Sequence, residues 1–193
     1  MVYPVEEIIA CTSHLYCYGE EDENLVRKIE FARTLQPGEK VVVFGIGASA
    51  RDCIVMGMAN PDIYIFTFDY GRRDFSASED LLVHTVELAH EYEVYNIIPW
   101  ISEATEALPD WSSPIGALCI DTDGEGTGKQ LERWAPFVRS GGRIFIQNYG
   151  LDKYPKIQKE TDAFIEKSFG FILGKQTPET ANNGPQLREV DVL

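Results

Sequence analysis

Short apolar runs alternate with longer segments of helical spacing along most of the chain. Val41–Phe44 is apolar at every position, which is typical of a strand buried on both faces. Leu25, Ile29, Ala32 and Leu35 instead recur at the spacing of one helix face. The same distinction predicts further strands over Ile63–Phe68, Val94–Ile98, Ile115–Ile120, Arg143–Gln147, Phe169–Leu173 and Gln186–Val192. It predicts helices over Val5–Cys11, Asn24–Leu35, Ser49–Ala59, Ser78–Glu91, Ser102–Leu108, Gly128–Val138 and Tyr154–Ser168.

Strands alternate with helices until the last two strands, which follow each other without a helix between them. Alternation favours right-handed crossovers and a doubly wound α/β sheet with helices on both faces. The final pair is joined by a loop, so we expect it to form an antiparallel edge.

A glycine turn follows the first strand, at Gly45-Ile46-Gly47. Glycine lets the chain turn sharply and lets backbone approach a ligand closely. The N–H groups at the start of the next helix would face that ligand. A strand-to-helix turn without a ligand is the alternative, because Gly-x-Gly alone is a weak signal.

Asp69 ends the second strand, a little over 20 residues beyond Gly47. In nucleotide-binding α/β folds an acid at this position accepts hydrogen bonds from ribose hydroxyls. The alternative is an Asp that starts a turn with Tyr70 and Gly71. Because Gly45-x-Gly47-x-x-Ala50 also fits the dinucleotide fingerprint, a nicotinamide cofactor stays open at this point.

Length and charge limit the function further. A chain of 193 residues can form one domain with a full core, which we assign to residues 25–193. Residues 1–24 are an N-terminal segment, either a solvated loop or a lid over the substrate. The net charge of −14, without a basic patch interleaved with aromatic residues, argues against nucleic acid as a partner.

The spacing of Cys11, Cys17, Cys53 and Cys119 is not that of a disulfide framework. We find no apolar signal region and no run long enough to span a membrane. The sequence therefore predicts a cytoplasmic protein without a membrane partner.

The order and spacing of these features resemble the class I S-adenosylmethionine-dependent methyltransferases, from about Leu25 to the C-terminus. The matching segments are Phe44–Ser49, Asp69, Ser102–Ala104, Asp121 and the run Trp134–Ile146 with its Ser-Gly-Gly turn. The loop Ile120-Asp121-Thr122-Asp123 is similar to that of a branch that includes small-molecule O-methyltransferases. The resemblance implies a seven-stranded, mostly parallel sheet in the order 3-2-1-4-5-7-6, with strand 7 antiparallel.

The resemblance also implies roles for individual residues. Asp69 would hold the cofactor ribose and Tyr70 would lie beside the adenine. Asp121 would lie near the sulfonium, where a carboxylate is favourable. The implied cofactor-binding residues are Gly45, Gly47, Ala48, Ser49, Asp69, Tyr70, Ser102, Glu103 and Asp121.

The departures from the family pattern concern the chemistry. Gly124 replaces the His of the Asp-Gly-Asp-His loop, so the candidate catalytic residues are Asp121, Asp123 and Glu125. Relatives that need a metal carry Asp or Asp-Asn after strand five, where this chain has Gln147-Asn148. Asp121, Asp123 and Asn148 could hold Mg²⁺ only as a poor ligand set, so a metal-independent reaction is favoured.

The sequence leaves three functions open. The first is methyl transfer from S-adenosylmethionine to a small-molecule acceptor, with oxygen favoured over nitrogen. The second is a methyltransferase-like domain that binds a nucleoside or a partner without catalysis. The third, least favoured, is a nicotinamide-dependent oxidoreductase. The sequence specifies neither the acceptor nor the oligomeric state.

Overall fold

The computed structural model describes residues 3–15, 22–45, 50–69, 78–121, 126–176 and 187–193. The helices are α1 (Val5–Cys11), α2 (Asp22–Thr34), α3 (Arg51–Ala59), α4 (Ser78–Glu91), α5 (Thr127–Trp134), the 3₁₀ turn η1 (Ala135–Phe137) and α6 (Pro155–Lys167). The strands are β1 (Lys40–Phe44), β2 (Tyr64–Asp69), β3 (Ile97–Ile101), β4 (Ile115–Ile120), β5 (Val138–Gln147), β6 (Phe171–Gln176) and β7 (Leu187–Val192).

The strands form one seven-stranded sheet in the order β3-β2-β1-β4-β5-β7-β6. β1 to β5 pair in parallel, and β7 lies antiparallel between β5 and β6. This confirms the predicted fold, including the antiparallel final pair.

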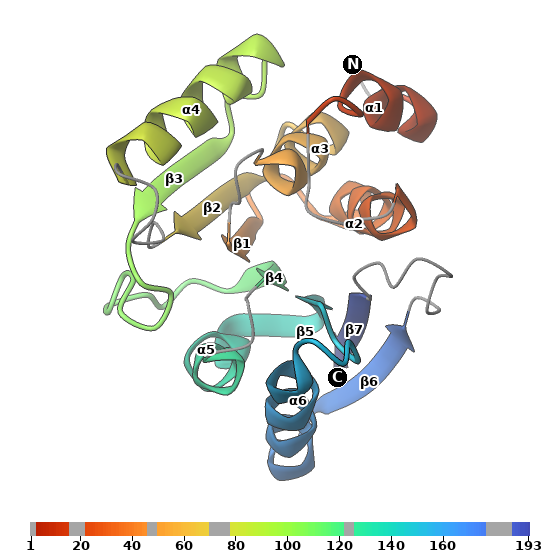
Figure 1. Ribbon diagram of the computed structural model, residues 1–193, viewed down its shortest axis with the longest axis vertical. Coiled ribbons are helices and arrows are strands. Elements are labelled where there is room, and N and C mark those ends of the chain that lie inside the picture. The colour runs from red at the N-terminus through yellow and green to blue at the C-terminus, as the bar shows by residue number, and fades with distance from the viewer. Residues whose placement is uncertain (1–2, 16–21, 46–49, 70–77, 122–125, 177–186) are drawn as a thin grey trace.

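Helices cover both faces of the sheet (Figure 1). Val41 and Val43 of β1 pack with α1, α2 and α3, whereas Val42 and Phe44 pack with α5 and α6 on the opposite face. α4 packs against α3 and β3. The alternation explains why β1 is an unbroken apolar run, since both of its faces are buried.

The third strand begins three residues later than predicted, at Ile97 rather than Val94. Val94 packs at the end of α4, and the Asn96 side chain donates to the carbonyls of Asn60 and Ile63, at 3.1 and 3.0 Å. The strand then continues through Pro99. On β3, the residues at even-numbered positions form the hydrogen bonds to β2. The ring nitrogen of Pro99 therefore points away from β2, where the pairing of these two strands needs no donor.

The helix predicted over Ser102–Leu108 is wrong, since this part of the described range 78–121 forms turns. A helix would pair the carbonyl of Ala104 with the N–H of Leu108, but that carbonyl accepts from a side chain instead. Trp134 Nε1 donates to Ala104 O at 2.6 Å, and Arg133 Nη2 donates to Leu108 O at 2.9 Å. Pro109 also disfavours a helical conformation at Leu108, whose φ is +43°.

β5 begins at Val138, five residues before the predicted start. A bulge accommodates the Ser140-Gly141-Gly142 turn, because Ile115 pairs with Val138 but Ala117 pairs with Arg143. A Cβ at Gly142 would lie 2.7 Å from Arg139 O, so only glycine fits this bulge without a shift.

α1 packs against α2 and α3 through the fully buried Ile8. Across the described residues, none of the helices is both long and apolar enough to cross a membrane.

Candidate active site

The carboxyl ends of β1 and β4 meet where the strand order reverses. Asp121 N donates to Phe44 O at 3.0 Å, so the ladder continues one residue beyond β4. Gly45 has φ +79°, and a Cβ placed on it would lie 2.1 Å from Asp121 O. Gly45 is therefore required both by its conformation and by the close approach of the two chains. Ligands of doubly wound sheets bind at this switch point.

Asp69 and Ser102 lie together at the ends of the next two strands. Ser102 N donates to Asp69 O at 3.1 Å, which extends the β2–β3 ladder to the edge of the sheet. Both residues are half-buried, and Glu103 beside them is exposed. The carboxylate of Asp69 thus ends a buried strand next to the switch point, on a rigid support.

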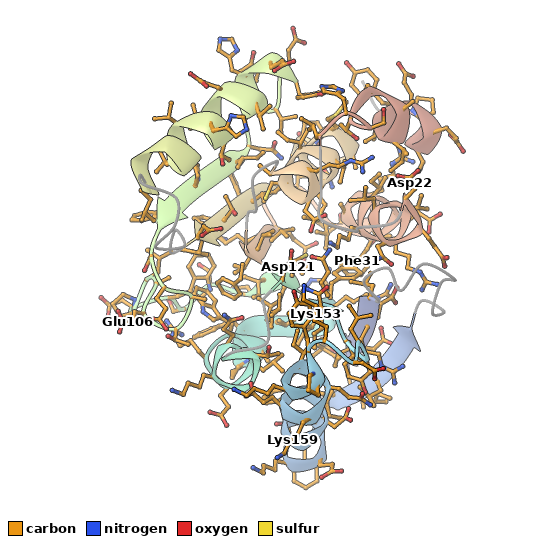
Figure 2. All side chains as sticks on the ribbon, viewed as in Figure 1. Asp22, Phe31, Glu106, Asp121, Lys153 and Lys159 are labelled. Atoms are coloured by element: carbon orange, nitrogen blue, oxygen red, sulfur yellow. The ribbon has the colours of Figure 1, made fainter. Side chains whose placement is uncertain are left out.

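Asp121 is also held by the neighbouring strand. Asn148 Nδ2 donates to Asp121 Oδ1 at 3.1 Å, and both residues are half-buried. Figure 2 labels Asp121, which lies in the middle of the molecule beside β4. Asn148 has φ +61°, a left-handed conformation that asparagine tolerates better than most residues. The hydrogen bond orients the carboxylate where β4 and β5 end.

Tyr149 fixes the end of β5 through contacts with Asp162 and Arg188. Its hydroxyl donates to Asp162 Oδ1 at 2.7 Å, and the Arg188 guanidinium lies 5.3 Å from its ring centre. Burial, and then the hydrogen bond to Asp162, raise the pKa of Tyr149 to about 12. Tyr149 is therefore a neutral donor near pH 7 and not a base, and it keeps the adjacent Asn148 in place.

Charged side chains that sequence reasoning missed lie buried at the start of α3. Lys28 Nζ lies 2.5 Å from Asp52 Oδ2, and Arg51 Nη2 lies 3.4 Å from Asp22 Oδ1. Lys28 and Arg51 are only 1% and 6% exposed. These pairs join α2 to the helix that follows the glycine turn. The signal was present, since Lys28 follows Leu25 by three residues on the apolar face of the predicted helix.

Six predicted site residues fall outside the described residues, namely Gly47, Ala48, Ser49, Tyr70, Asp123 and Glu125. Those that the structure describes, Gly45, Asp69, Ser102, Glu103, Asp121 and Asn148, all follow or end a strand at the same edge of the sheet.

Of the proposed metal ligands the structure describes Asp121 and Asn148, whereas Asp123 lies outside the described residues. Asn148 turns its Nδ2 donor toward Asp121, whereas a shared Mg²⁺ would need oxygen atoms from both. Within the described ranges, no group of three or more His, Cys, Asp or Glu side chains could hold a metal ion. We therefore derive no step through a metal.

Solved structures that resemble this chain include methyltransferases. An O-methyltransferase from Bacillus cereus in complex with S-adenosylhomocysteine (SAH) matches with a TM-score of 0.70 at 13% identity, over 97% of this chain and 90% of that chain. A methyltransferase from Podospora anserina bound to SAH matches with a TM-score of 0.72 at 13% identity, over 100% and 90%. An rRNA methylase from Streptococcus thermophilus matches with a TM-score of 0.69 at 16% identity, over 88% and 96%.

The chain has the fold of the class I S-adenosylmethionine-dependent methyltransferases. At the level of sequence, no protein-family model matches it, and no curated protein has significant similarity to it. The methyltransferase fold places its switch point between β1 and β4, where Gly45 meets Asp121.

Proposed function

We propose that this protein transfers a methyl group from S-adenosylmethionine to an oxygen atom of a small-molecule acceptor. The observation that carries the proposal is the meeting of Gly45 with Asp121 at the switch point, with Asp69 at the end of the neighbouring β2. Two of the methyltransferases with this fold hold SAH, the product form of that cofactor.

The described residues fit this cofactor. Asp69 would accept hydrogen bonds from the ribose hydroxyls, and Ser102 with Glu103 would border the adenine. Because Gly45 has no side chain, the turn after β1 can lie against Asp121, beside the proposed cofactor position. The acids at this edge also favour a ligand that carries a positive sulfonium. Gly47, Ala48, Ser49 and Tyr70 complete the proposed binding set.

Asp121 is the proposed catalytic residue among those described, with Asp123 and Glu125 as further candidates in the same loop. The cofactor supplies an electrophilic methyl group, and the protein aligns the acceptor with it. Asn148 holds the Asp121 carboxylate, which can accept the proton of the acceptor hydroxyl as that oxygen forms its new bond. The chemistry needs no metal in this form.

A small-molecule acceptor is proposed over RNA because of the net charge of −14. The rRNA methylase among the structural neighbours keeps RNA as the competing acceptor class. A cytoplasmic location also belongs to this proposal, since the cysteine spacing is not that of a secreted, disulfide-bonded domain.

Calorimetric titration with S-adenosylmethionine, SAH and NAD tests the cofactor. We expect both sulfur compounds to bind and NAD not to bind. Binding of NAD alone would instead support the nicotinamide-dependent oxidoreductase. Tight SAH binding without turnover on any acceptor would support the non-catalytic, nucleoside-binding alternative.

Turnover on a panel of hydroxylated acceptors tests the chemistry. We expect wild-type activity to persist in EDTA and to fall at least tenfold in Asp121→Asn. Activity that is lost in EDTA and restored by Mg²⁺ would bring back the Asp121, Asp123 and Asn148 metal set. Full activity of Asp121→Asn would remove this residue from the mechanism.

A further inference from the structure

A pocket of about 230 Å³ lies between α4 and β3, at the outer edge of the sheet. Its lining includes Val86 and Ala89 of α4 and Pro99 of β3, together with His90 and Tyr95, whose ring centres are 6.1 Å apart. We call these five residues and the space between them the α4–β3 pocket. Among the described residues, no acid, lysine or arginine lines it. Val86 and Tyr95 are 49% and 75% exposed, so the pocket opens to solvent. In Figure 1, α4 and β3 form the upper left border of the molecule.

α4 carries a second apolar face besides the one that it buries. Leu88 and Ala89 are buried in the cluster that joins α4 to α3. Val83, Val86 and His90 are all exposed, and their spacing places them in one stripe on a different side of the helix. A surface helix normally turns polar residues to solvent on its unburied side, and an exposed apolar stripe marks an interaction site. This stripe and the α4–β3 pocket therefore form one candidate docking surface.

The charged side chains around this surface are all acidic. Glu87 follows Val86, and Glu91 and Glu93 follow His90, and all three acids are exposed. None of them forms an ion pair with another described residue. The sequence explains this, because all 17 Lys and Arg residues lie outside residues 74–128, a stretch that contains 12 Asp and Glu. The apolar surface thus lies within an acidic rim that its own chain leaves uncompensated.

This charge narrows the partner to a basic polypeptide. The acids would repel an anionic lipid surface or a nucleic acid. A second copy that presents the same surface would place acids against acids. An added β-strand is also disfavoured, because Pro99 removes the outward donor of β3. A helix with one apolar and one basic face is complementary to both the pocket and the rim.

We propose that the α4–β3 pocket and the adjoining stripe bind a basic amphipathic helix of a partner protein. An apolar side chain of that helix fills the pocket between Val86 and Tyr95, and its Lys or Arg side chains pair with Glu87 and Glu91. The pocket extends from Tyr95 to Pro99, whereas the candidate active site begins at Ser102, beyond the carboxyl end of β3. The docking surface is therefore separate from the site of the proposed methyl transfer.

The probe is a fluorescein-labelled peptide of about 18 residues made of Leu and Lys, with Leu at helical spacing on one face. A peptide of the same composition without that spacing, and a peptide with Glu in place of Lys, are the comparators. Fluorescence anisotropy measures binding to the full chain. We expect the amphipathic Lys peptide to bind at least tenfold more tightly than either comparator, with an affinity that falls as salt rises.

Two pairs of variants locate the bound peptide. Val86→Ser removes an apolar side chain from the pocket, and Ile172→Ser, on β6, removes one that is equally exposed, at 49%. Glu87→Gln/Glu91→Gln removes two acids of the rim, and Glu30→Gln/Glu166→Gln removes two exposed acids from α2 and α6. We expect at least a fivefold loss of affinity in each surface variant and less than a twofold loss in its control.

The outcomes that would overturn the proposal are distinct. Absence of binding, equal binding of the two Lys peptides, or equal losses in surface and control variants would each do so. Sedimentation velocity on the free protein tests the second copy as occupant. We expect Val86→Ser to leave the oligomeric state of wild type unchanged, and a wild-type dimer that Val86→Ser dissociates would assign the surface to a second copy instead.

Calorimetry with SAH on the same proteins separates this proposal from the proposed function. We expect wild type and the surface variants to bind SAH equally, which also shows that the variants are folded. If none of them binds SAH while the peptide results hold, the methyltransferase function fails and the docking surface stands.

Discussion

At the scale of single residues, Gly45 is important for the candidate site because it has no side chain. Both its φ of +79° and the 2.1 Å approach of Asp121 O to a would-be Cβ exclude other residues. Gly38 shows the conformational effect alone, because it has φ +82° but no atom lies within 4 Å of a Cβ placed on it.

We therefore expect Gly45→Ala to destabilise the fold more than Gly38→Ala. Gly38→Ala should cost only the left-handed conformation, about 1–2 kcal/mol. Gly45→Ala should cost about 3 kcal/mol or more, because strands β1 and β4 must also separate. Urea denaturation of both variants measures the difference, and equal losses would show that the close approach does not matter.

Asp69 tests the cofactor site without affecting the core. Asp69→Ala should remove charge-assisted hydrogen bonds to ribose, worth about 1.5–3 kcal/mol. We expect the affinity for SAH to fall roughly ten- to a hundredfold, with the melting temperature nearly unchanged. Calorimetry on the folded variant checks this, and unchanged affinity would refute the assignment of Asp69 to the ribose.

At the scale of elements, an aromatic cluster holds the segment between β3 and β4, which forms turns and not a helix. Trp134 is fully buried, packs against Trp111, Phe44 and Phe68, and donates to Ala104 O. The segment carries Ser102 and Glu103, so its order affects the proposed adenine site.

We expect Trp134→Phe to loosen this segment. The substitution leaves the carbonyl of Ala104 without its buried donor, at a cost of about 1–3 kcal/mol. Trp111→Phe is the matched control, because Trp111 Nε1 donates to Ser113 O, two residues away and outside residues 102–108. Hydrogen exchange across residues 102–108 should increase more in Trp134→Phe than in Trp111→Phe. The same exchange in both variants would contradict the role of the Ala104 contact.

Elements whose partners are local in sequence were predictable, and those that depend on distant side chains were not. α4 matches its prediction at both ends, because an N-terminal Ser and helical periodicity define it. The missing helix over 102–108 depends on hydrogen bonds from Trp134 and Arg133, which lie 30 and 25 residues from their acceptors. The early start of β5 depends on a bulge against β4, and periodicity carries no information on such register shifts.

The candidate site shows the same division. The order of strands and the residues that follow them brought Asp121 and Asn148 to one edge, as the sequence predicted. The buried pair of Lys28 and Asp52 was missed, because helical spacing reveals a buried position but not the partner that neutralises its charge.

At the scale of the whole molecule, an ion pair joins distant parts of the chain at the opposite end of the sheet. Arg139 Nη2 donates to Glu39 Oε2 at 3.1 Å, across 100 residues of sequence. The hydrogen bond from Arg139 is the main cause that lowers the pKa of Glu39 below its ordinary value of 4.5. A lowered pKa gives stability that is present above pH 4.5 and is lost as pH falls through the pKa of the folded state.

Glu39→Gln should therefore destabilise the protein near pH 7 and not at low pH. We expect a loss of about 1 kcal/mol at pH 7 that decreases below pH 4.5. Denaturation curves across this pH range test it, with Glu30→Gln, on the exposed side of α2, as the control. A loss that is independent of pH would assign the effect to packing and not to charge.

The outward nitrogen of Pro99 has a consequence for how copies of this protein meet. β3 is an edge strand, and an exposed edge can template the addition of a strand from another chain. Pro99 removes the central donor of that edge, and its ring blocks close approach. Trp100 and Ile101 beside it are partly exposed, 44% and 42%, and would otherwise make this edge prone to aggregation. Pro99 thus hinders the pairing of β3 with a strand of another molecule.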